Sequence, residues 1–219
     1  MTEEKKPAKI HLLDTLTANQ IAAGEVIERP ASVVKELVEN AIDAGATRIE
    51  VHIFDANCEK IQVSDNGSGM LPEDMRLAVQ RHATSKIRAA ADLEHLTTLG
   101  FRGEALPSIA SVSNFQLLTR PADEEFATSI RIDGGEQTEC QQTGGQAGTT
   151  VIVENLFFNV PARRKFLRTN ATEGRYINEL LTRLALSRPD VRFKLVSNDK
   201  EVLSTPGNGS LFDAITALY

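Results

Sequence analysis

The chain has 219 residues, a formal net charge of −6 and 41% hydrophobic residues, as expected of an ordinary globular protein with a buried core. This charge argues against attraction of the whole domain to nucleic acid, although a local basic patch is compatible with it. No apolar run reaches the roughly eighteen residues of a membrane span, and residues 1–10 lack the apolar core of a signal peptide. Cys58 and Cys140 form no CxxC pair, so we expect two reduced thiols in a cytoplasmic protein with no membrane partner.

Several segments carry apolar residues at the spacing of an amphipathic helix. Thr15 or Thr17 is expected to cap the first of them. Pro30 is expected to open the second, because a first helical residue needs no N–H, and Gly45 is expected to end it. The helices expected are residues 17–27, 30–43, 72–80 and 172–187, and a further one is opened by the segment at residues 100–106.

Other segments alternate apolar and polar residues, as half-buried strands do. The strands expected are residues 48–55, 61–63, 115–119, 128–132, 149–153, 191–196 and 201–203. Asp133-Gly134-Gly135 is typical of a hairpin turn. Hairpins with few βαβ units indicate an α+β fold, a two-layer α/β sandwich on a mixed, largely antiparallel sheet.

Composition also suggests how the chain divides into domains. Residues 1–9 are polar and expected to form a disordered arm. Residues 10–206 are expected to form the main domain. The segment Pro206-Gly207-Asn208-Gly209 has the composition of a boundary, so residues 207–219 are expected to begin a second domain.

Glu36 and Asn40 are the first candidates for chemistry. They are four residues apart and share a stripe with Val33, so they border the apolar face of one helix. A carboxylate held there can orient and deprotonate a water, and an amide oxygen one turn later suits Mg²⁺, which prefers oxygen ligands. The alternative is a polar stripe on a half-exposed helix.

The segment Asp65-Asn66-Gly67-Ser68-Gly69 follows an expected strand and precedes a helix. It lacks the spacing of a calcium loop. It could be an ordinary turn, or Asp65 could be a buried acceptor for a purine amino group, with glycines admitting the base closely.

Residues 82–103 lack clean periodicity and are expected to form a loop or lid. Gly100 through Leu106 opens a helix after glycines, where backbone N–H groups can cradle phosphate. The upstream residues 81–86 add a lysine and two hydroxyls. No Walker loop and no GxGxxG motif occurs.

The order of these motifs, followed by Gly148-Thr149-Thr150 at the start of a strand, resembles the GHKL ATPases. That superfamily includes gyrase-type topoisomerases, chaperone ATPases, sensor histidine kinases and MutL proteins. The longer strings resemble the MutL family of DNA mismatch repair proteins from about residue 10 to the end, and a topoisomerase-like or chaperone-like ATPase is the alternative. These strings are Asn19–Pro30, Lys35–Ala46, Arg81–Ile87, Gly100–Leu106 and Pro161–Leu167.

The resemblance implies the Bergerat fold of the GHKL ATPases and a slow, Mg²⁺-dependent ATP hydrolysis. Glu36 would be the general base, Asn40 the Mg²⁺ ligand, and Asp65 the acceptor for the adenine amino group, assisted by Thr150. The other residues expected at the ATP site are Asp43, Gly67, Gly69, Thr84, Ser85, Lys86, Gly100, Phe101, Arg102, Gly103, Glu104, Ala105 and Leu106.

The resemblance also implies partners. ATP binding would order the lid and drive homodimerisation, so the domain would act as a nucleotide-gated clamp as well as an enzyme. A following domain would supply a lysine to the γ-phosphate, so hydrolysis by this chain alone is expected to be weak. A mismatch-recognition protein and DNA are the implied partners, with work at the nucleoid of a bacterial-type cell. Residues 163–168 are basic and could touch DNA, or be a solvated or packed helix face.

Overall fold

The computed structural model describes residues 12–56, 59–87, 100 and 103–219, so the expected arm at residues 1–9 lies outside it. Its centre is a single eight-stranded sheet, in the order β5-β4-β3-β6-β2-β1-β7-β8. The strands are β1 (Arg48–Phe54), β2 (Lys60–Asp65), β3 (Asn114–Arg120), β4 (Ala127–Asp133), β5 (Glu136–Thr143), β6 (Gly148–Glu154), β7 (Arg192–Ser197) and β8 (Lys200–Ser204). Among the strands that the structure describes, only β1 and β7 pair in parallel, which confirms the mixed, largely antiparallel sheet.

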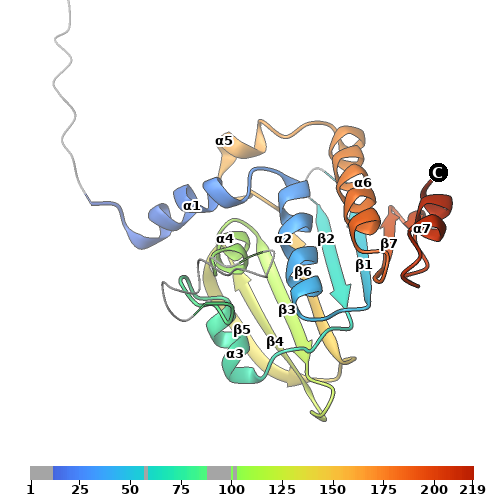
Figure 1. Ribbon diagram of the computed structural model, residues 1–219. Coiled ribbons are helices and arrows are strands. Elements are labelled where there is room, and N and C mark those ends of the chain that lie inside the picture. The colour runs from blue at the N-terminus through green and yellow to red at the C-terminus, as the bar shows by residue number, and fades with distance from the viewer. Residues whose placement is uncertain (1–11, 57–58, 88–99, 101–102) are drawn as a thin grey trace, which may run out of the picture.

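The helices form the second layer, on one face of the sheet (Figure 1). They are α1 (Thr15–Val26), α2 (Pro30–Asp43), α3 (Pro72–Ala78), α4 (Ala105–Ser111), α5 (Pro161–Arg164), α6 (Asn170–Ser187) and α7 (Leu211–Leu218). Helix α2 contacts β1 and β2, α4 contacts β3 and β4, and α6 contacts β7 and β8. Helix α1 packs mainly on α4. The expected two-layer sandwich is therefore confirmed.

Alternation of side chains along the strands decides which face is covered. In β1, Ile49, Val51 and Ile53 are buried beneath the helices, whereas Glu50 and His52 lie on the other face. Helix α2 contributes its apolar stripe to the same core, as its spacing predicts; the buried members are Val33, Val34, Leu37, Val38, Ala41 and Ile42. This helix spans the expected residues 30–43.

The cap of α1 differs from the expectation. The helix begins at Thr15, and Asp14 is its N-cap: one carboxylate oxygen accepts from the Thr17 N–H at 2.9 Å and the other from the Thr17 hydroxyl at 2.7 Å. A cap residue must lie before the first helical turn, so the prediction of Thr15 or Thr17 was wrong by one turn or less.

The spacing of apolar residues in the sequence did not predict two elements, β5 and α5. Strand β5 follows the expected hairpin turn at residues 133–135, but its side chains are almost all exposed because it is the edge strand, so no apolar alternation marks it. Helix α5 is a single turn. The two strands expected at residues 191–196 and 201–203 form the hairpin of β7 and β8, and Asn198 and Asp199 both adopt positive φ in its turn.

Helix α7 follows the glycine-rich segment at residues 206–209 and contacts α6 and β8. The division of the chain at residue 207 stays a prediction. None of the helices in the described part of the chain is long and apolar enough to cross a membrane.

Candidate functional site

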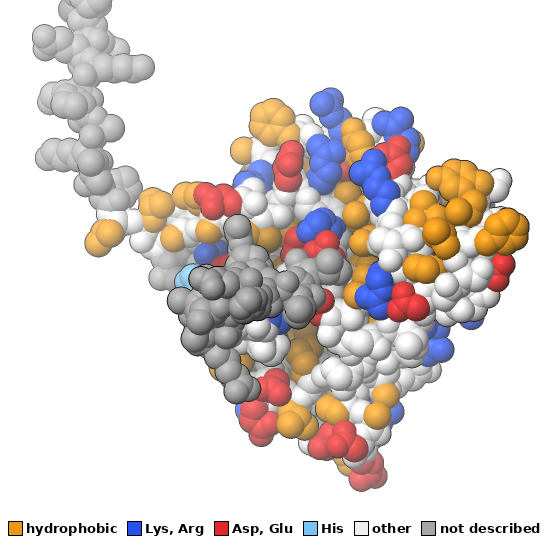
Figure 2. Space-filling view, viewed as in Figure 1, with side chains coloured by type: hydrophobic (Ala, Val, Ile, Leu, Met, Phe, Trp, Pro, Cys, Tyr) orange, Lys and Arg blue, Asp and Glu red, His pale blue; other side chains and the backbone are white. Residues whose placement is uncertain are grey.

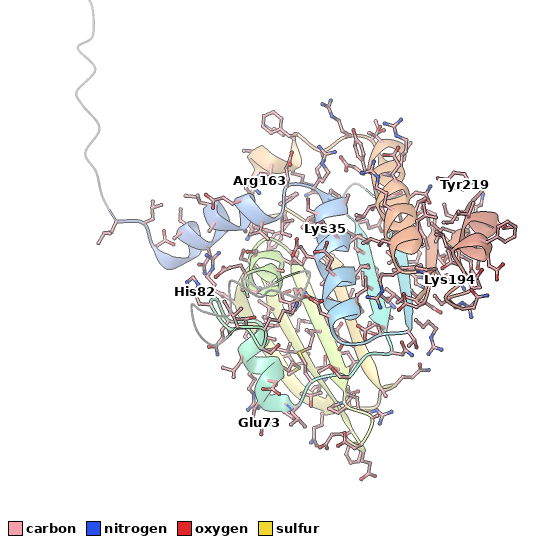
Figure 3. The ribbon with its side chains drawn as sticks, in the orientation of Figure 1. Lys35, Glu73, His82, Arg163, Lys194 and Tyr219 are labelled. Carbon is pink, nitrogen blue, oxygen red and sulfur yellow. The ribbon has the colours of Figure 1, made fainter. Side chains whose placement is uncertain are left out.

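A cleft of about 1060 Å³ opens between α2 on one side and α3, residues 82–86 and the start of α4 on the other. Its floor is the helix-covered face of the sheet, where Val63, Leu117 and Val151 come from three adjacent strands. Lys35 on α2 and His82, after α3, both line it (Figure 3). An apolar floor with polar groups around it is the usual construction of a small-molecule site.

The middle of α2 presents acidic side chains to this cleft. Glu36 and Glu39 both line it, and the Lys35 ammonium donates to Glu36 Oε1 at 3.1 Å and to Glu39 Oε2 at 2.9 Å. Burial lowers the pKa of Lys35, but the hydrogen bonds and charges of the two carboxylates outweigh it, so the pKa stands above its usual value. Lys35 and Glu39 were not among the expected site residues.

Further along α2, the side-chain oxygens of Asn40 and Asp43 accept hydrogen bonds from the ammonium group of Lys86. Lys86 Nζ lies 2.5 Å from Asp43 Oδ2 and 3.2 Å from Asn40 Oδ1. Gly100 N also approaches Asp43 Oδ2, at 3.5 Å. The side chains of Lys86 and Asp43 are only 17% and 10% exposed, so this ion pair is shielded from solvent. The structure thus brings the predicted lid residue Lys86 onto the predicted metal-binding face of α2.

Asp65 lies at the end of β2, on the cleft side of the sheet. Burial raises the pKa of its carboxyl group, and hydrogen bonds from the backbone N–H groups of Gly67 and Thr149 oppose that shift. The Gly67 N–H lies 2.8 Å from Asp65 Oδ1. The ionised carboxylate is therefore held in a fixed orientation, with acceptor capacity left for a ligand.

The two loop glycines serve protein packing. A Cβ on Gly67 would lie 2.9 Å from the Ala44 carbonyl oxygen, and one on Gly69 would lie 2.4 Å from the Arg120 carbonyl oxygen. Gly69 also adopts a φ of 67° and lines the cleft, whereas Gly67 does not line it. The glycines are therefore needed to fold the loop tightly against its neighbours. This packing role was not part of the expectation, which was that the glycines let the base approach closely.

Thr150 lies on the opposite face of the sheet from Asp65. Its hydroxyl donates to Ser64 Oγ at 3.0 Å, and Ser64 is its partner on β2. Thr149 instead pairs with Asp65 and lines the cleft. Because successive strand residues point to opposite faces, a shift of one residue exchanges the two threonines. Thr150, expected to assist from behind Asp65, therefore faces away from the cleft, and Thr149 is the threonine that lies beside Asp65.

Glu104 joins the start of α4 to residues 81 and 82, where the expected lid begins. Its carboxylate accepts from the His82 backbone N–H at 3.2 Å, contacts His82 Nδ1 at 2.8 Å and lies 3.7 Å from Arg81 Nη1. Gly103 adopts a φ of 64°, and a Cβ there would lie 2.4 Å from the Ala83 carbonyl oxygen. Close backbone contact therefore fixes this part of the lid.

Most of the expected site residues meet in the one cleft. Those that line it are Glu36, Asn40, Asp43, Asp65, Gly69, Thr84, Ser85, Lys86, Gly100, Gly103, Glu104, Ala105 and Leu106. Gly67 and Thr150 are not among them. Phe101 and Arg102 lie outside the described residues.

The basic segment at residues 163–168 is divided in its contacts. Arg163 donates to the Ile27 carbonyl oxygen at 2.9 Å and lies over the Phe157 ring, so it packs against the end of α1. Arg164, Lys165 and Arg168 are at least partly exposed, and Lys and Arg side chains gather over α5 and the start of α6 (Figure 2). Of these four basic side chains, Arg163 alone therefore fits the alternative that the segment packs against its neighbours instead of contacting DNA.

Comparisons with known proteins agree with this geometry. Residues 27–147 match the family described as histidine kinase-, DNA gyrase B-, and HSP90-like ATPase. The chain is 59% identical to the DNA mismatch repair protein MutL of Symbiobacterium thermophilum and 56% identical to that of Desulforudis audaxviator, over 96% and 97% of its own length. It spans only 33% and 38% of those relatives.

A solved structure described as the Aquifex aeolicus MutL ATPase domain complexed with ADP superposes with a TM-score of 0.74 at 38% identity. The match covers 88% of this chain and 69% of that one. These relatives favour MutL over a topoisomerase-like or chaperone-like protein. The chain therefore belongs to the MutL family of DNA mismatch repair proteins and forms its ATPase domain, of the histidine kinase-, gyrase- and chaperone-like ATPase fold.

Proposed function

We propose that the cleft binds an adenine nucleotide with Mg²⁺ and that the longer protein hydrolyses ATP there. One observation carries this proposal: a single cleft contains two different polar environments. One is the buried hydrogen-bond acceptor Asp65 on β2, and the other is the set of side-chain oxygens on α2 beside the shielded ammonium group of Lys86. An adenine base and a phosphate chain bound to Mg²⁺ need these two kinds of environment at once.

Asp65 and Thr149 would bind the exocyclic amine of the base. The Asp65 carboxylate can only accept hydrogen bonds when ionised, and an amine donates them. Val63, Leu117 and Val151 would contact the faces or edges of the ring from the floor of the cleft. This pairing of an apolar floor with a fixed acceptor supports adenine as the base.

The donor set on α2 fits Mg²⁺. Asn40 presents an amide oxygen and lines the cleft. Mg²⁺ is usually held by one or two protein oxygens, several waters and the substrate phosphates, so a fuller protein cage is not needed. When bound, Mg²⁺ would neutralise charge on the phosphates. Lys86, with Thr84 and Ser85 beside it, would donate to phosphate oxygens.

Glu36 would act as the general base. Its carboxylate would take a proton from the water that attacks the γ-phosphorus, while the bond from that phosphorus to the bridging oxygen breaks and leaves ADP and phosphate. Lys35, 3.1 Å from Glu36 Oε1, holds the carboxylate in place. Positioning and charge stabilisation would supply most of the rate.

The test of the base is Glu36→Ala in the longer protein. We expect the Kd for ATP to change little and hydrolysis to fall at least about a hundredfold, because a general base contributes about that much. Glu179→Ala, at an exposed position of α6, is the matched control. Hydrolysis at the normal rate in the Glu36 variant would exclude it as the base, and loss of ATP binding in that variant would contradict its placement.

In the longer protein, we propose, nucleotide binding drives homodimerisation and couples mismatch recognition to later repair steps on DNA. Helix α1 and the residues before it expose Leu12, Leu13 and Ile21, an apolar surface suited to a second copy. Sedimentation with a non-hydrolysable ATP analogue should show a dimer that is absent without nucleotide. A monomer in both states would refute the clamp and leave nucleotide binding intact.

A further inference from the structure

Thr119, near the end of β3, is a polar side chain with only 1% of its surface exposed. It was not among the residues expected at the site, and it does not line the cleft. Its hydroxyl nevertheless joins the two segments that carry the proposed base-binding groups. The Met70 N–H, at the end of the Asp65 loop, donates to Thr119 Oγ1 at 2.9 Å, and Thr149 Oγ1 lies 3.0 Å away.

The hydrogen-bond partners of Thr119 settle the direction of the bond to Thr149. A hydroxyl has one proton and two lone pairs. The Gly148 carbonyl oxygen, 3.2 Å from Thr119 Oγ1, can only accept. If Thr119 donates to Gly148, it accepts from Met70 and from the Thr149 hydroxyl, and all three contacts are made. If Thr119 donated to Thr149 instead, the Thr119 oxygen and the Gly148 carbonyl oxygen would face each other with no proton between them. An unmade bond at a buried group is costly, so the first arrangement is favoured.

The direction of this bond decides what Thr149 can offer to the cleft. The proton of Thr149 is committed to Thr119, so the Thr149 oxygen turns only lone pairs toward a ligand. Asp65, directly across from Thr149 in the sheet, is also an acceptor when ionised. The pair therefore matches an amine, which donates, and opposes an oxo group, which accepts.

We propose that Thr119 is a positioning residue that sets base selectivity, because it fixes Thr149 as an acceptor and so favours an exocyclic amine over an oxo group. This inference rests on the proposed adenine site. Without the Thr119 hydroxyl, the Thr149 O–H is free to rotate and donate, and the cleft would then tolerate an oxo group.

The experiment measures the Kd of ADP and of inosine diphosphate, which carries an oxo group in place of the amine, by calorimetry on the full chain. Thr119→Val keeps the shape and removes the hydroxyl, and we expect the ratio of the two Kd values to fall about tenfold. Thr119→Ser should keep the wild-type ratio. Thr128→Val is the matched control, because Thr128 is buried directly across from Thr119 on β4 and does not line the cleft.

An unchanged ratio in Thr119→Val, or equal loss of affinity for both nucleotides, would overturn the inference and leave adenine binding standing. Failure of the wild-type chain to bind ADP would instead refute the proposed function. If Thr119→Val does not fold, Thr119→Ala removes the same hydroxyl with less crowding and is judged by the same ratio. A matching fall in Thr128→Val would also contradict the role of Thr119.

Discussion

Replacing Asp65 by asparagine tests the adenine site most directly, because it changes one oxygen into an amino group and little else. Asp65 Oδ1 accepts from the Gly67 N–H at 2.8 Å, and the carboxylate also accepts from the Thr149 N–H. An amide has a single oxygen. If that oxygen keeps the backbone bonds, the new amino group faces the amine of the base, and two donors meet.

The cost follows from those hydrogen bonds. A hydrogen bond to a charged acceptor contributes about 1.5–3 kcal/mol, and a buried donor left unpaired costs a similar amount. Asp65→Asn should therefore weaken ADP binding by about 3 kcal/mol, which is on the order of a hundredfold in Kd. The bound phosphates would be untouched, so the loss should be much smaller for inosine diphosphate, which presents no amine.

The same substitution should also change how stability depends on pH. Burial raises the pKa of Asp65 in the folded chain above its ordinary value of 3.8. A raised pKa means that the stability contributed by the protonated group is complete below the unfolded value and is lost as pH rises through the folded value. The neutral amide has no such loss. The Tm of the variant relative to wild type should therefore increase as the pH rises above the ordinary pKa of 3.8 and level off once the folded carboxyl group is ionised.

Calorimetry with ADP and thermal unfolding without nucleotide measure the two effects on the same samples. Asp199→Asn, in the exposed β7–β8 turn where asparagine also tolerates a positive φ, is the control for the charge change. Unaltered ADP affinity in the Asp65 variant would refute its place beside the base. A Tm difference that is flat with pH would refute the burial of its charge.

Two further changes test the lid and the basic segment. Gly103→Ala should lower the free energy of unfolding by at least about 2 kcal/mol, because its Cβ would strike the Ala83 carbonyl; Gly45→Ala shares the positive φ but has open space, and should cost about 1 kcal/mol in the same urea titration. Equal costs would contradict the close approach at Gly103. Charge reversal at Arg164 and Arg168 should reduce the salt slope of DNA binding by the longer protein by about 1 for each phosphate that the altered side chains no longer bind, and an unchanged slope would place DNA elsewhere.

The parts of the fold that the sequence predicted are those where one element buries one face. Helix α2 has a clear apolar stripe, so its limits and the placement of Glu36 and Asn40 at its border follow from spacing alone. Strand β1 likewise alternates cleanly. Strand β5 is exposed on both faces, and periodicity carries no information about such an edge strand.

The candidate site shows a second limit. Residues on α2 share a face by their spacing, but the choice between Thr149 and Thr150 depends on the register of β6 against β2. Alternation within β6 gives the signal: Val151 and Val153 are buried, and Thr149 is in phase with them. Lys35 and Thr119 could not be found this way, because their roles depend on interactions between side chains that no pattern along one segment records.

The interactions of Lys86 show how the cleft can be stable before any nucleotide arrives. The Lys86 ammonium lies between Asp43 and Asn40. It therefore places a positive charge beside the α2 oxygens that would otherwise face Mg²⁺. Mg²⁺ alone would therefore compete with a shielded ion pair for the Asn40 oxygen, and repulsion from the ammonium would oppose it. A phosphate chain changes that balance, because it gives Lys86 a more highly charged partner and frees the Asn40 oxygen for the metal. Metal and nucleotide should accordingly bind together, each strengthening the other through this one lysine.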